Sequence, residues 1–347
     1  MPGHEMTVRQ ALDLASQQVG RRFDQAPAEQ VAVRLTLSRL YQALGASDQA
    51  EPHARAALAL AENAVPAQVA PLRLELADVL IDRDRLDEAS ALIPATPGAS
   101  LADDQLLSRL AFQRGDYAAA ADVLRPYFQN ASSVLNQDVG AMQRLAQALR
   151  MLGEHQEALR LLDRAVSVLG AEFGENHPLR LGLRHDRGVV LRHLGQFDAA
   201  VDTLSDVLAQ RRVVLGDAHP GTLMTINELA TVYQEQQRFK DAEPLFREAL
   251  SVRENLYGER HHLTRNSMSN LGLLLVLSGQ LDEASNLYER TLRIETDLIG
   301  EDHPDTLALM HNIAGLYRKQ SRYADALAMH ERVLSGARRV LGAQAWQ

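Results

Sequence analysis

Small and aromatic residues recur along this chain at spacings that predict pairs of packed helices. In one stretch, Ala230 and Tyr233 are followed by Ala242 and Phe246. Residues three or four positions apart lie on one face of a helix, so this stretch predicts two antiparallel helices that share an apolar seam. We expect the alanines where the two helices cross most closely, and the aromatic rings in the space beside them.

The same small positions recur every 42 residues through the second half of the chain. The residues equivalent to Ala230 are Gly188, Gly272 and Ala314, and those equivalent to Ala242 are Ala200, Ala284 and Ala326. A bulkier residue there would overpack the crossing by about 1–3 kcal/mol. Self-similarity at a fixed period is the signature of a repeat architecture, so we predict four regular helix pairs over residues 173–341.

A connector of constant chemistry separates these predicted pairs. Glycine recurs at the same spacing with histidine three positions later, at Gly174, Gly216, Gly258, Gly300 and Gly342 and at His177, His219, His261 and His303. Proline follows three of these histidines, and His262 follows the other. Glycine suits a left-handed position just after a helix, and proline suits a first helical turn. We therefore expect one helix to end near Leu215 and the next to begin at Pro220.

The first half of the chain continues this pattern with less regular connectors. We assign four further repeats to residues 30–172. Two prolines and a glycine predict a bend in the array near residues 94–100. Residues 5–22 carry apolar residues at helical spacing, and they predict a helix that caps the exposed end of the array.

The fold class that follows is all-α: a right-handed α-solenoid of eight stacked antiparallel helix pairs. Residues 342–347 open a further connector, and the last predicted helix carries Leu327, Val333, Leu334 and Val340 with no successor to cover all of them. Either the array is cut short at this point, or its C-terminal end pairs with another copy of the chain.

Residues 215–223, Leu-Gly-Asp-Ala-His-Pro-Gly-Thr-Leu, resemble the connector of the kinesin-light-chain class of tetratricopeptide repeat, which is common in bacteria. The resemblance covers residues 173–341 closely and residues 30–172 more loosely. Arg180 replaces threonine in one connector and His262 replaces proline in another. The resemblance implies a tetratricopeptide fold whose first helices line a concave groove.

A second, short resemblance concerns the start of the chain. Residues 7–13 look like the segment that enters the C-terminal repeat domain of certain bacterial signalling proteins. Those proteins carry an N-terminal kinase or winged-helix domain, often followed by a membrane span. This resemblance implies that the chain is the sensing half of a larger receptor.

Charge and composition exclude several classes of partner. The formal net charge of −9 opposes general attraction to nucleic acid or to an anionic membrane. The absence of cysteine excludes disulfides and thiolate metal sites. No apolar run of about 18 residues occurs, so we expect no membrane insertion in this chain. The compartment stays open between the cytoplasm and, for the C-terminal domain of a single-span receptor, the periplasm.

The periodic histidines do not predict a metal site. Equivalent histidines on successive helix pairs would lie at least about 8–10 Å apart, whereas zinc donors lie about 2 Å from the ion. We expect a structural role for them in the connector. The sequence also has no phosphate-binding loop, nucleotide-binding glycine turn, nucleophile elbow or zinc-protease helix, so we expect neither enzymatic activity nor a cofactor.

The positions expected to face a ligand lie on the first helix of each repeat, on the side turned away from the second helix. Counted from the small residue, these positions are the offsets −3, +1 and +4. The groove residues that we single out are Gln143, Gln147, Arg150, His185, Arg192, Asn227, Gln234, Leu273, Val276, His311 and Arg318, with Arg39, Gln42, Gln105 and Arg109 further back. Acidic residues are nearly absent from these offsets, apart from Asp78.

This set of residues leads to our functional hypothesis. Repeat stacks bind through continuous faces, and arginine forks with amides suit an extended peptide that offers acidic or carbonyl groups. We expect a non-catalytic scaffold that binds a protein or peptide in its concave groove, as the interaction or sensing module of a bacterial signalling protein. The alternative interpretation of these polar residues is a solvated helix face that binds no partner. The other functional candidate is homo-oligomerisation, with the uncapped C-terminal end forming a homodimer.

Overall fold

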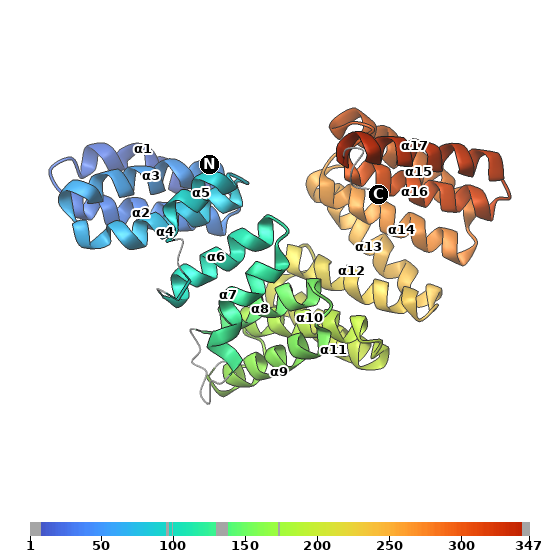
Figure 1. Ribbon diagram of the computed structural model, residues 1–347, viewed down its shortest axis with the longest axis horizontal. Coiled ribbons are helices and arrows are strands. Elements are labelled where there is room, and N and C mark those ends of the chain that lie inside the picture. The colour runs from blue at the N-terminus through green and yellow to red at the C-terminus, as the bar shows by residue number, and fades with distance from the viewer. Residues whose placement is uncertain (1–7, 95–96, 99, 130–137, 173, 342–347) are drawn as a thin grey trace, which may run out of the picture. The chain divides into compact units, whose positions relative to one another are not determined.

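The protein is described by a computed structural model that covers residues 8–94, 97–98, 100–129, 138–172 and 174–341. Over these residues the chain forms seventeen α-helices and one short 3-10 helix, η1 (Pro66–Gln68), with no strand (Figure 1). The α-helices are α1 (Val8–Arg22), α2 (Pro27–Ala43), α3 (Ser47–Ala64), α4 (Val69–Asp82), α5 (Leu86–Leu92), α6 (Leu101–Gln113), α7 (Tyr117–Gln129), α8 (Val139–Met151), α9 (His155–Glu172), α10 (Pro178–His193), α11 (Phe197–Leu215), α12 (Pro220–Glu235), α13 (Phe239–Tyr257), α14 (His262–Ser278), α15 (Leu281–Ile299), α16 (Pro304–Lys319) and α17 (Tyr323–Leu341).

After α1, the helices form eight consecutive pairs, from α2–α3 to α16–α17. The two members contact each other in the pairs α2–α3, α4–α5, α6–α7, α10–α11, α12–α13, α14–α15 and α16–α17. The chain divides into two compact units between Val168 and Leu169, within α9. The expected all-α solenoid of antiparallel helix pairs is confirmed. Part of the expected cap (residues 5–7), part of the expected bend (residues 95, 96 and 99) and the expected connector at 342–347 lie outside the described residues.

The first helices of successive pairs lie against one another within each unit. Helix α4 contacts α6 and α6 contacts α8 in the first unit, while α10 contacts α12 and α14 contacts α16 in the second. These first helices therefore form a layer of their own in each unit. We call the outer surface of this layer, formed by α2, α4, α6 and α8 or by α10, α12, α14 and α16, the first-helix face.

The small residues stand where the two helices of a pair cross, as the sequence predicts. A methyl group added at Gly188 would lie 2.6 Å from Leu204 Cγ, and one added at Gly272 would lie 2.3 Å from the Tyr288 ring. Ala230 and Ala314, at the equivalent positions, are fully buried. The close approach of the helices therefore depends on the absence of side-chain volume at this one position.

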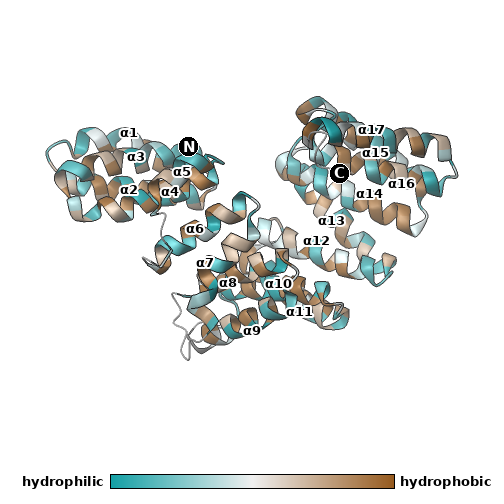
Figure 2. Cartoon of the chain, viewed as in Figure 1, coloured by the Kyte–Doolittle hydropathy of each residue, from teal (hydrophilic) through white to brown (hydrophobic). Residues whose placement is uncertain are grey.

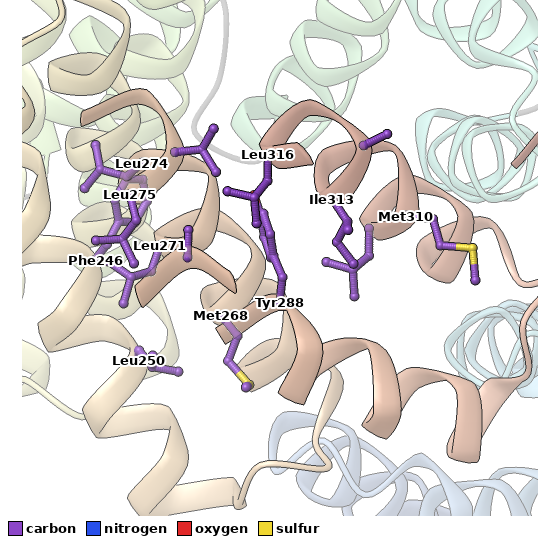
Figure 3. Close-up of a cluster of buried hydrophobic side chains, with 14 of the residues drawn as sticks. Phe246, Leu250, Met268, Leu271, Leu274, Leu275, Tyr288, Met310, Ile313 and Leu316 are labelled. Carbon is purple, nitrogen blue, oxygen red and sulfur yellow. The ribbon is translucent and has the colours of Figure 1, made fainter. Parts of the chain in front are cut away.

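Large side chains fill the space beside these crossings in the second unit. Phe246, Tyr288 and Met310 come from three successive pairs, and each is at most 1 % exposed. Figure 3 shows them with the leucines of α14 and α16 in one continuous cluster. Colouring by hydropathy shows that the helices alternate apolar and polar faces (Figure 2). Each pair therefore shares its core with the pairs next to it.

Each motif residue of the connector has a distinct structural task. Helix α11 ends at Leu215, and α12 begins at Pro220, as expected. Gly216 has φ 87° and ψ 163°, a region that only glycine occupies readily. This differs from the left-handed helical conformation that we expect from the sequence, because the chain leaves the helix extended. His219 Nδ1 accepts a hydrogen bond from the Gly221 amide at 3.0 Å, and Thr222 Oγ1 donates to the Gly216 carbonyl at 2.8 Å.

Candidate functional site

Most of the residues singled out from the sequence are accessible on the first-helix face. Arg318 and His311 are exposed, and seven others are half-buried: Gln143, Gln147, Arg150, Arg192, Asn227, Gln234 and Leu273. His185 and Val276 are only 6 % exposed. Val276 belongs to the core cluster of the second unit, and His185 Nδ1 lies 3.4 Å from Thr225 Oγ1. These two side chains turn toward the neighbouring helix rather than toward solvent.

Arg192, on α10, is already engaged by the next repeat. Its Nε donates to Glu228 Oε1 at 2.6 Å, and its Nη1 donates to Glu235 Oε1 at 2.6 Å. Burial lowers the pKa of Arg192, but the two carboxylates outweigh that effect and raise the pKa above its ordinary value. On the same face, Asn270 Nδ2 donates to Asn227 Oδ1 at 2.9 Å. The polar groups of this face in the second unit thus bond from one repeat to the next.

A similar network crosses the first-helix face of the first unit. Arg109, on α6, forms ion pairs with Asp78 and Asp82 of α4. Gln42, on α2, donates to the same two carboxylates at 3.2 and 3.0 Å. Arg39 Nε donates to Glu75 Oε2 at 3.0 Å. The acidic residues of α4 therefore neutralise arginines that the sequence presents as a positively charged surface.

Arg144, on α8, is the exception in this network. Among the residues that the structure describes, its Nε is buried with no hydrogen-bond partner, and no ion pair involves it. Burial lowers the pKa of Arg144, as does the positive charge of Arg109, while Asp78 and Asp82 oppose that shift. Arg144 is therefore a half-buried cation whose hydrogen-bonding capacity is not used by the surrounding protein.

Two hollows in the first-helix face meet at Arg144. The larger has a volume of about 500 Å³ and is lined by Arg39, Pro71, Leu74, Glu75, Asp78, Leu101, Ala102, Gln105, Leu106 and Arg144. The smaller, of about 150 Å³, is lined by Ser108, Arg109, Phe112, Gln113, Arg144 and Gln147. The structure thus brings the predicted Arg39, Gln105, Arg109 and Gln147 together around one position.

The sequence reasoning missed Arg144 and Glu75 because both occupy offset −2 from the small residue of their repeat. Offset −2 also carries Glu228, the partner of Arg192. Long side chains at this position reach across to the neighbouring first helix, so they belong to the same surface as offsets +1 and +4. A comparison of charge at offset −2 along all repeats would have revealed the acidic residues.

The periodic histidines contact backbone amides rather than a shared ion. Within the described ranges, no group of three or more His, Asp or Glu side chains could hold a metal ion. His219, His261 and His303 each accept a backbone hydrogen bond at the start of a helix. No helix in the described part of the chain is long and apolar enough to cross a membrane.

Comparison with known families and structures agrees with this architecture. The model of the tetratricopeptide repeat family matches residues 138–212, 180–255, 222–297 and 277–339, and a second model of that repeat matches residues 31–56 and 106–126. No protein with a curated description matches the chain. A candidate kinesin light chain of Podosopora anserina, with nearly identical TPR-like repeats, is 25 % identical with a TM-score of 0.54, over 59 % of this chain and 97 % of its own.

Two Rap proteins share the fold over most of the chain. A Rap protein complexed with competence and sporulation factor has a TM-score of 0.62 at 14 % identity, over 90 % of this chain and 99 % of its own. The Rap conjugation gene regulator of plasmid pLS20, in complex with a Phr peptide, has a TM-score of 0.51 at 13 % identity, over 91 % and 98 %. At these identities the likeness concerns the fold alone.

Proposed function

Because the chain belongs to the tetratricopeptide repeat family, we propose that it is a non-catalytic scaffold that holds an extended peptide or protein segment on its first-helix face. The observation that carries this proposal is the half-buried Arg144, which lines two hollows between first helices and whose Nε has no hydrogen-bond partner among the described residues. A buried polar group without a partner is costly, so a ligand that supplies the missing acceptor gains affinity at this position.

The fold neighbours support a sensing role. Two Rap proteins of the same fold are described in complex with competence and sporulation factor and with a Phr peptide. By analogy, the chain would act as the interaction or sensing module of a bacterial signalling protein, which agrees with the resemblance of its opening segment. The ligand would be a protein or peptide in extended form, and the activity would be a change of binding partner rather than a reaction.

A displayed library of random peptides, selected on the full chain, tests this function. We expect the affinity of selected peptides to fall roughly tenfold or more when Arg150→Glu and Arg318→Glu reverse two charges on the first-helix face. A carboxylate in place of a guanidinium cannot donate a charge-assisted hydrogen bond to the peptide. Arg293→Glu, on the second helix α15, is the matched control and should bind as the wild type does. If no peptide is selected, or if only Arg293→Glu weakens binding, the proposal fails.

Self-association is a second candidate because α17 leaves apolar side chains uncovered. Tyr323 is 67 % exposed, Leu327 61 % and Val340 50 %. These three side chains lie open to solvent on the last helix that the structure describes.

Sedimentation velocity over a range of protein concentrations tests this candidate. A homodimer through α17 should dissociate when Leu327→Glu places a charge in its apolar contact, because burying an unpaired charge is costly. Leu256→Glu, at an exposed position of α13 in the interior of the array, is the control. A monomer at every concentration would remove this candidate.

A further inference from the structure

Two side chains that line the larger hollow of the first-helix face each carry a buried polar atom without a partner, and the chemistry of these two atoms is complementary. Arg144 Nε is a donor without an acceptor, and Glu75 Oε1 is an acceptor without a donor, among the residues that the structure describes. Glu75 uses its other oxygen for Arg39, and its side chain is 12 % exposed. The side chains around the hollow therefore carry one unused hydrogen-bond donor and one unused acceptor.

The remaining lining gives this hollow an apolar wall and a balanced charge. Pro71 and Leu74 come from α4, and Leu101, Ala102 and Leu106 come from α6. The charged lining consists of two arginines, Arg39 and Arg144, and two carboxylates, Glu75 and Asp78. With two positive and two negative groups, the hollow has no net charge that would select an anion or a cation.

From these observations we infer that the hollow binds one neutral peptide unit of an extended partner segment, together with an apolar side chain. The peptide N–H donates to Glu75 Oε1, the peptide C=O accepts from Arg144 Nε, and the side chain packs against Leu74, Leu101 and Leu106. The partner is thus recognised here through its backbone and one apolar residue, and not through an acidic side chain. This inference rests on the proposed peptide-binding function, which it makes specific.

Other occupants fit these observations less well. An acidic side chain would satisfy Arg144 but would lie beside the carboxylates of Glu75 and Asp78, and like charges repel in a half-buried site. A cation would satisfy Glu75 but would meet Arg144 and Arg39. A water molecule could bond both atoms, but it would leave the apolar wall of a hollow of about 500 Å³ uncovered.

The test compares three probes on the full chain by fluorescence polarisation or calorimetry. The first probe is a set of N-acetylated, C-amidated heptapeptides with a central leucine among glycine, serine and alanine. The second set carries a central glutamate instead, and the third probe is free leucine. We expect the leucine heptapeptides to bind with weak salt dependence, and the other two probes to bind at least roughly tenfold more weakly.

Substitutions then separate the two free atoms from their surroundings. Arg144→Met removes the donor and Glu75→Leu removes the acceptor, and each should weaken the leucine heptapeptides roughly tenfold. Arg73→Met changes an exposed residue of α4 that does not line the hollow. This control should bind as the wild type does. Gln105→Trp adds volume to the wall of the hollow at a residue that carries neither atom. It should abolish binding while the helical circular dichroism is retained.

Several outcomes would overturn this inference. Stronger binding of the glutamate set, binding of free leucine alone, or equal binding of the leucine set by Arg144→Met and by wild type would each do so. If peptides selected from the random library bind the chain but none is affected by Arg144→Met or Gln105→Trp, this site is wrong while the peptide-binding function stands. If the library yields no peptide at all, both proposals fail.

Discussion

Single residues at the helix crossings are constrained by what each one faces. A Cβ added at Gly272 would lie 2.3 Å from the ring of Tyr288, which is 1 % exposed in the core cluster. Gly315 also lies within a first helix, yet nothing stands within 4 Å of the place that its Cβ would occupy. Two helical glycines of one unit therefore differ in the reason for their presence.

These two glycines should respond oppositely to alanine. We expect Gly272→Ala to lower the free energy of unfolding by about 1–3 kcal/mol, because the new methyl group overpacks the crossing. Gly315→Ala should raise it by about 0.5–1 kcal/mol, because alanine loses less backbone entropy in a helix. Urea unfolding followed by circular dichroism measures both. A stabilised Gly272→Ala would show that the crossing is not tightly packed.

At the scale of elements, the connectors explain why histidine recurs with the repeat. In three connectors the imidazole Nδ1 accepts a hydrogen bond from the amide two residues later: His219 at 3.0 Å, His261 at 3.3 Å and His303 at 3.2 Å. The imidazole thus caps the first turn of the next helix. A protonated imidazole cannot accept this bond, and its charge would oppose the positive end of the helix dipole.

Acid should therefore loosen these connectors, and His261 offers the clearest test. Burial lowers the pKa of His261, and the neighbouring His262, Arg265 and Arg253 lower it further. The ring also stacks on Tyr257, with centroids 4.6 Å apart. Since the folded pKa lies below the unfolded value of about 6.5, the stabilisation is complete above that pH and is lost as the pH falls through the folded pKa.

The variant His261→Asn keeps an N-cap that does not titrate. Between pH 7 and pH 5, we expect the free energy of unfolding of the wild type to fall by about 1 kcal/mol more than that of His261→Asn, the usual magnitude of one cap. Parallel urea titrations at several pH values give this difference. Identical pH dependence in the two proteins would mean that the His261 cap contributes nothing.

On the scale of the whole molecule, stability is local because each pair shares its core with its neighbours. In the second unit, contacts join each helix from α10 to α17 to the next one, and they also join α10 to α12 and α14 to α16. Arrays of this kind behave as sums of repeat and nearest-neighbour terms. A destabilising substitution in the core of one pair should therefore lower the local stability of the adjacent pairs. This effect should decrease with distance along the chain.

Hydrogen exchange on Phe246→Ala tests this locality. Phe246 is 1 % exposed in the core cluster of the second unit, and its truncation should cost about 3–5 kcal/mol. We expect faster amide exchange in α12 to α15 and unchanged exchange in α2 to α5. Equal acceleration everywhere would mean that the chain unfolds as one cooperative body.

The sequence predicted the packing of the helices well, but it did not predict which charged side chains bond to each other. The crossing at Gly188 and the helix start at Pro220 were predictable because volume and proline geometry act at fixed positions. The partners of Arg192 were not predictable from the offsets used, since its carboxylates sit at positions −2 and +5 of the next repeat. Arg144 was not predicted either, because it also occupies offset −2. Long side chains make contacts that depend on the distance between helices, which a single repeat does not encode.

The bond from Arg192 to Glu228 and Glu235 also bears on how such an array can change length. Removing the 42 residues 220–261 would place each buried side chain next to the residue one period later, which occupies the equivalent position. The shortened chain should therefore still fold. Arg192 would then stand opposite Asn270 and Leu277, the residues at the same two positions one period later. The excision would remove both carboxylates that bind Arg192, and it would leave a positive charge where the net charge of the three groups had been −1. Gain or loss of a whole repeat should thus change the packing of the core little, while it changes the charge of the first-helix face and with it the ligands that this face can bind.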